Sequence, residues 1–199
     1  MSSGKVIHSR FIHNLREVKN MNKILSKPVA DLISKISWDH RISLGSASAD
    51  TILGKNTPFR FFLDLDPEAF ELTEAMIQNL EGFFSFTDKD VEKIKNPLWE
   101  DCLSACTGAD YGFDEIEGNT HAENNLIGMN ILNKEDAYAN VVFTVTMSTE
   151  DGEEFLPNRY YVLDSQSVRW EQENGVAIII KNDNIIAAYN ASPYFSQYE

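Results

Sequence analysis

The segment between Asp110 and Asn125 gathers the residues best suited to hold a metal ion or to carry acid/base chemistry. Its carboxylates, which stand close to His121, are Asp110, Asp114, Glu115, Glu117 and Glu123. Hard cations bind several oxygen ligands, which this segment can supply. The spacing lacks the Asp-x-Asp-x-Asp-Gly order of a calcium loop, and one histidine with scattered carboxylates does not specify a zinc site. We therefore assign no metal ligand and no cofactor, and we interpret the segment as a solvated acidic loop.

The two cysteines offer a second candidate. Cys102 and Cys106 are four residues apart in a segment with a helical pattern, so they share one helical face. No further cysteine or histidine stands at ligand spacing, which favours two small buried residues over a metal pair. Two unpaired thiols in a chain without a signal-peptide core or a membrane-spanning run indicate a cytoplasmic location.

Catalytic arrangements of other kinds are absent from the sequence. There is no Gly-x-Ser-x-Gly elbow and no glycine-rich phosphate loop. His8 and His13 fall in the N-terminal segment, and His40 falls on the apolar register of an expected strand, which predicts a partly buried, hydrogen-bonded side chain. We therefore assign no catalytic residue and do not expect an enzyme.

The net charge of −14 is unevenly distributed. Residues 1–41 carry eight Lys/Arg and three Asp/Glu, whereas residues 42–199 carry nine and 28. The acidic part would repel nucleic acid and anionic lipid, and it would attract a basic protein and accelerate the encounter. Solubility alone is the alternative explanation of the acidity.

A second acidic segment, Trp170-Glu171-Gln172-Glu173-Asn174-Gly175, has the residues of a hairpin turn before an apolar strand. It resembles the C-terminal stretch of a group of bacterial domain-of-unknown-function families, in which the order Trp-Asp-Glu-Glu-His-Gly is common. Trp170, Glu173 and Gly175 match that stretch; the histidine of the families is absent here, so no titratable chemistry is expected. The resemblance implies an immunity protein, which neutralises a toxin by binding it.

Both acidic segments combine carboxylates with aromatic residues, a combination typical of recognition surfaces. The predicted partner-binding residues are Asp110, Tyr111, Phe113, Asp114, Glu115, Glu117, Trp170, Glu171 and Glu173. The expected function is non-catalytic inhibition of a basic toxin domain. Two alternatives stay open: an interaction domain that dimerises through its N-terminal helix, and an enzyme or metal-binding protein that uses the loop at residues 110–123.

The expected organisation is a basic helical segment at residues 1–34 followed by an acidic α+β domain at residues 35–199. In the first segment, Ile7, Phe11, Leu15 and Val18 have the spacing of an amphipathic helix, and a short second helix follows Ser26. This N-terminal helix would pack on the domain or mediate self-association.

In the acidic domain, alternating residues predict strands at 36–44 and 59–65, separated by a polar loop at 45–58. Thr73 and Thr87 are expected to begin helices, and Pro97 to kink the second helix or to open a third. From Leu126 onward the sequence predicts strands almost throughout, in an antiparallel meander: 126–132, 139–147, 159–163, 168–171, 176–181 and 185–189. The expected fold is α+β, a mainly antiparallel twisted sheet with two or three helices on one face.

Overall fold

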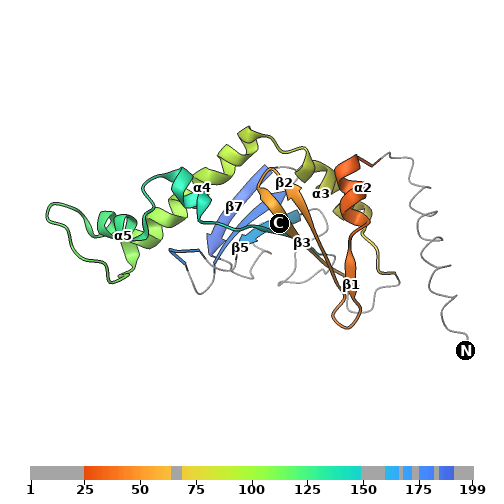
Figure 1. Cartoon of the computed structure of the whole chain (residues 1–199), viewed down its shortest axis with the longest axis horizontal. Coiled ribbons are helices and arrows are strands. Elements are labelled where there is room, and N and C mark those ends of the chain that lie inside the picture. The colour runs from red at the N-terminus through yellow and green to blue at the C-terminus, as the bar shows by residue number, and fades with distance from the viewer. Residues whose placement is uncertain are drawn as a thin grey trace, which may run out of the picture.

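The computed structural model describes residues 25–63, 69–148, 160–165, 168–171, 175–181 and 184–190 (Figure 1). The predicted N-terminal amphipathic helix and the last two residues of the predicted strand 59–65 therefore lie outside the described residues, as do Glu173 and Asn174 of the second acidic segment; within the described part, that strand ends at Phe62.

The described strands form one seven-stranded sheet in chain order. The strands are β1 (Ser37–Asp39), β2 (Leu44–Thr51), β3 (Gly54–Phe62), β4 (Thr144–Ser148), β5 (Tyr160–Ser165), β6 (Val176–Lys181) and β7 (Asn184–Asn190). Neighbouring strands pair antiparallel except β3 and β4, which run parallel with Phe59 opposite Val145. The α+β class and the mostly antiparallel sheet are thus confirmed, the predicted meander is confirmed only from β4 to β7, and one parallel pair is added.

The helices are inserted between β3 and β4, except for α2, which precedes the sheet. They are α2 (Lys27–Ile33), α3 (Glu74–Phe84), α4 (Asp88–Gly108), α5 (His121–Met129) and α6 (Lys134–Ala139). Thr73 caps α3 by accepting from the amide of Met76, and Thr87 begins α4 in a capping box with Asp90, so both predicted starts are confirmed. Pro97 lies inside α4, which continues to Gly108 as one helix.

The core joins buried side chains of α2, α3 and α4 to one face of the sheet. The strand register places the following side chains on that face: Phe59, Phe61, Val145, Met147, Tyr161, Leu163, Ile178 and Ile180. Phe83 of α3 meets this face edge-on, with ring centroids 5.5 Å from Phe59 and 6.0 Å from Tyr161. Each fully buried side chain of this size contributes roughly 1.5–3 kcal/mol. Val29 and Leu32 of α2 belong to the same core.

The predicted strand at 36–44 is confirmed only at Ser37–Asp39 and at Leu44, and the predicted loop at 45–58 is wrong. Residues 36–44 form a tight hairpin because Asp39 Oδ1 accepts from the Arg41 amide at 3.0 Å and Ser43 adopts a positive φ of 51°. Most of residues 45–58 belong to β2 and β3. His40 consequently lies in the turn with an exposed side chain, 4.1 Å from the Phe70 ring between centroids, rather than on a buried face.

The predictions for 126–132, 139–147 and 168–171 also need correction. Residues 126–129 end α5, and Asn130 terminates that helix in the left-handed region at φ 56°. Asn133 then caps α6, so only the end of the predicted strand 139–147 is β4. Val168 and Glu171 form an isolated bridge around a turn instead of a strand.

Candidate partner-binding surface

The acidic loop is held between the C-terminus of α4 and the N-terminus of α5, and it is shorter than predicted because residues 121–125 belong to α5. Asn125, which is buried, donates from Nδ2 to the carbonyl oxygens of Cys106 at 2.8 Å and Ala109 at 2.9 Å. His121 Nε2 donates to the same Ala109 oxygen at 2.9 Å. One side-chain amide and one imidazole thus satisfy carbonyl groups that the end of a helix leaves without intrahelical partners.

A capping box fixes the start of α5. Glu123 Oε2 accepts from the amide of Thr120 at 2.6 Å, while Thr120 Oγ1 accepts from the amide of Glu123 at 3.2 Å. The amide and the hydroxyl group of Thr120, which both donate to the Glu123 carboxylate, hold its pKa below the usual value. Among the candidate metal ligands of the sequence, His121 and Glu123 therefore act as the attachments of the loop to its helices.

The loop also packs on the side of α5. The amide of Ile116 donates to Asn124 Oδ1 at 3.2 Å, and Asp110 Oδ1 accepts from the amide of Gly112 at 2.8 Å. The ring of Phe113 lies directly on Gly128, where an added Cβ would overlap it. The glycine therefore has a packing function, because it leaves room for the aromatic ring.

A third attachment links the loop to the C-terminal part of the chain. Tyr111 donates from its hydroxyl group to the carbonyl oxygen of Trp170 at 2.6 Å, and Trp170 Nε1 donates to Asp101 Oδ2 of α4 at 2.8 Å. The structure thus brings together the aromatic residues of the two predicted acidic segments. Trp170 is only 1% exposed, so its indole lies in the core and not on the surface. The neighbouring Arg169 contacts the end of α5, because its guanidinium group donates to the carbonyl oxygen of Met129 at 2.5 Å.

Several ionisable groups around the contact of Tyr111 with Trp170 have raised pKa values. Burial raises the pKa of Asp101, and the negative charge of Glu171 adds to the rise, while the hydrogen bond from Trp170 opposes it. Burial likewise raises the pKa of Tyr111 and of the Cys102 thiol, which lies on the same buried face of α4 as Cys106. A buried thiol with a raised pKa is a poor nucleophile, in keeping with the structural role expected for this pair.

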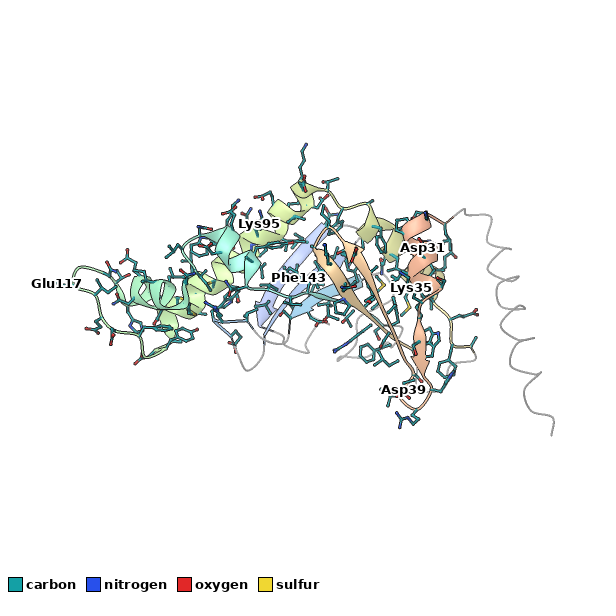
Figure 2. All side chains as sticks on the ribbon, in the orientation of Figure 1. Asp31, Lys35, Asp39, Lys95, Glu117 and Phe143 are labelled. Atoms are coloured by element: carbon teal, nitrogen blue, oxygen red, sulfur yellow. The ribbon has the colours of Figure 1, made fainter. Side chains whose placement is uncertain are left out.

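The carboxylates of the loop point into solvent. Asp110, Asp114, Glu115 and Glu117 are exposed, and none of them has an ion-pair partner within the described part of the chain. From residue 96 to residue 133 the sequence contains seven Asp/Glu and no Lys or Arg. Figure 2 shows Glu117 at the extreme end of the molecule, on the loop beside α5. The result is a concentrated negative potential at one end of the molecule.

Apolar side chains are exposed among these carboxylates. Phe113 is 38% exposed, Ile116 47% and Ile127 44%. Phe113 and the backbone amide of Ile116 contact α5 at Gly128 and at the Asn124 side chain, and Asn124, Ile127 and Gly128 share one side of that helix. We call the surface formed by residues 110–117 and this side of α5 the acidic end.

The other predicted binding residues lie elsewhere or outside the structure. Glu171 is half-buried at the bridge with Val168, close enough to Asp101 to raise its pKa. Glu173 lies outside the described residues. The missed members of the surface are Ile116 and Ile127. Their signal in the sequence was the capping box at Thr120 and Glu123, which predicts that Ile127 belongs to a helix and not to a strand.

Two further features concern metal binding and acid/base chemistry. No three His, Cys, Asp or Glu residues of the described ranges are grouped in a way that could hold a metal ion. An open cavity of about 490 Å³ lies at the β1–β2 hairpin, beside Trp38, His40 and the ion pair of Asp39 with Arg41. The hydrogen bonds from Arg41 lower the pKa of Asp39 to about 2, so this carboxylate is not poised for acid/base catalysis near neutral pH.

None of the helices that the structure describes combines the length and the apolar character that crossing a bilayer requires. The chain matches no protein-family model, no curated protein and no solved structure.

Proposed function

We propose that this chain is a non-catalytic binding protein that uses its acidic end to recognise a basic surface of another protein, in the manner of an immunity-type inhibitor of a toxin domain. The observation that carries the proposal is the combination of exposed carboxylates, without ion-pair partners among the described residues, with exposed apolar side chains on a loop attached at three places. The attachments are made by Asn125, Thr120 with Glu123, and Tyr111.

The attachments favour binding because they reduce the entropy that the loop loses when a partner docks. Ordering a mobile side chain at an interface costs about 0.5–1.5 kcal/mol, and ordering a loop costs more. The hydrogen bonds of Asn125 and Tyr111 and the contact of Phe113 with Gly128 are made in the free protein. A partner therefore meets a surface that already has its shape.

The charges and the apolar side chains have different roles in this proposal. Carboxylates at the rim of an interface mainly accelerate association by attracting a basic partner over a distance. Phe113, Ile116 and Ile127 supply the apolar contact area, since aromatic and aliphatic residues at the centre of an interface contribute most of its affinity. Trp170 has a supporting role, because its indole is buried and holds Asp101 while its carbonyl oxygen holds Tyr111.

The test is a comparative capture experiment with three full-length proteins as bait in native lysate. The first is the unmodified chain. The second, the loop variant, carries Asp114→Asn, Glu115→Gln and Glu117→Gln. The third, the control variant, carries Asp31→Asn, Glu71→Gln and Glu74→Gln, which remove the same charge from exposed positions at the α2–α3 end.

A basic protein identified by mass spectrometry should be retained by the unmodified chain and by the control variant, and lost from the loop variant. Exposed charges contribute little to stability, so both variants should keep the fold, which circular dichroism checks. Capture of the same proteins in equal amounts by the loop and control variants would remove the acidic end from the interface and refute the proposal.

A further inference from the structure

The apolar part of the acidic end has the composition of a docking surface for an amphipathic basic segment. We call the exposed side chains of Phe113, Ile116 and Ile127 beside α5 the strip. The exposed carboxylates of Asp110, Asp114, Glu115 and Glu117 belong to the same loop as Phe113 and Ile116. Exposed apolar patches with a polar rim commonly mark binding sites. A complementary ligand would carry an apolar stripe flanked by positive charges.

The first 24 residues of this same chain have that composition. They contain five Lys/Arg and one Glu, and Ile7, Phe11, Leu15 and Val18 recur at the spacing of one helical face. These residues lie outside the described part of the structure. Their net charge of +4 complements the four exposed carboxylates of residues 110–117.

Geometry favours docking between two molecules over docking within one. Figure 1 shows α2, which follows the N-terminal segment, at the opposite end of the molecule from α5. The 21-residue helix α4 alone separates the two ends by about 31 Å. The apolar stripe ends at Val18, and the seven residues from there to Leu25 span at most about 25 Å when fully extended, so the whole stripe could not lie along the strip of its own molecule.

We propose that the N-terminal segment of one molecule docks on the acidic end of a second copy. Each copy offers one segment and one acceptor surface, so a reciprocal exchange closes a dimer with twofold symmetry. The dimer covers the surface that an external basic protein would use, and the two binding events therefore compete. The inference concerns the surface of the proposed function, but it requires no external partner.

Sedimentation velocity of full-length proteins tests the inference over a range of concentrations. Alongside the loop and control variants, a fourth protein, the segment variant, carries Lys5→Gln, Arg10→Gln, Arg16→Gln and Lys19→Gln. The unmodified chain and the control variant should form dimers in low salt that dissociate in about 1 M salt, where screening shortens to roughly 3 Å. The loop variant and the segment variant should each have a dimer dissociation constant at least about tenfold higher than that of the unmodified chain.

A mixture of the loop variant with the segment variant supplies the matched control for folding. The loop variant retains an intact segment and the segment variant retains an intact acceptor surface, so the mixture should form a complex that neither protein forms alone at the same concentration. An unmodified chain that stays monomeric, a loop variant that dimerises like the control variant, or a mixture without a complex would each overturn the inference. A monomeric chain that still captures a basic protein through its loop would leave the proposed function standing.

Discussion

Replacing Trp170 by phenylalanine should destabilise the protein through the partly buried carboxylate of Asp101. The indole is 1% exposed and donates from Nε1 to Asp101 Oδ2 at 2.8 Å. Phenylalanine cannot donate this hydrogen bond, and a hydrogen bond to a charged group contributes about 1.5–3 kcal/mol. The smaller ring also leaves part of the indole volume empty, which adds on the order of 1 kcal/mol. The expected loss in the free energy of unfolding at neutral pH is about 3 kcal/mol.

The loss should depend on pH with a definite sign. Burial holds the folded-state pKa of Asp101 above its unfolded value of 3.8, and the bond from Trp170 opposes that rise, so Trp170→Phe raises the folded-state pKa further. An ionised carboxylate of this kind lowers stability above its folded-state pKa, and the penalty disappears as the pH falls below the unfolded value. The difference between the two proteins should therefore be larger at neutral pH than at a pH of about 3.5.

Urea unfolding of both proteins, followed by circular dichroism at the two pH values, measures this difference. Tyr111→Phe is the matched control, because it removes a hydroxyl group that donates to the carbonyl oxygen of Trp170 at 2.6 Å. This neutral bond should cost about 1 kcal/mol at both pH values. A loss for Trp170→Phe that is below about 0.5 kcal/mol, or that is the same at both pH values, would refute the assignment of the charged hydrogen bond.

Two further predictions concern the packing around the acidic loop. Gly128→Ala should displace the Phe113 ring and increase amide hydrogen exchange in residues 111–118, whereas Gly108→Ala, whose added Cβ meets no atom within 4 Å, should leave that exchange unchanged; equal exchange in both variants would contradict the contact. Cys102 and Cys106 are fully buried, and burial raises the pKa of both thiols, so a thiol reagent should modify them only in denaturant; rapid reaction of the native protein would contradict their placement.

Local signals in the sequence predicted the parts of the fold that depend on neighbouring residues. Thr73 and Thr87 mark true helix starts because a hydroxyl cap and its amide partner are within three residues of each other. The alternation around Phe59 and Phe61 identified β3 because both rings are buried on one face. The hairpin of β6 and β7 was also predictable, because two apolar strands joined by a short connection pair antiparallel.

The errors have two physical causes. Residues 45–51 alternate small residues such as Ala47 and Ala49 with polar ones, which made β2 resemble a loop because alanine and serine have little strand preference. The segment after Leu126 is rich in aliphatic residues, and their identity suggested strands. The capping box at Thr120 and Glu123 indicates instead that a helix starts before this segment.

The candidate surface was predicted in part. The exposed carboxylates of residues 110–117 lie in one loop, so the sequence placed them together. The hydrogen bonds of Trp170 with Asp101 and Tyr111 could not be predicted from local sequence patterns. Asp101 and Trp170 are 69 residues apart, and Tyr111 and Trp170 are 59 residues apart. The parallel pairing of β3 with β4 could not be predicted either, because it depends on the path of the four helices between these strands.

The association kinetics of the captured basic partner provide the most direct measurement of the central claim. The rate constant should fall as salt is raised from a low value to about physiological strength, where screening shortens to roughly 8 Å, and the dissociation rate should change less. At low salt the loop variant should associate more slowly than the unmodified chain, and the control variant should be affected less. Equal association rates and affinities for the unmodified chain and the loop variant would contradict the claim that the acidic end binds the partner.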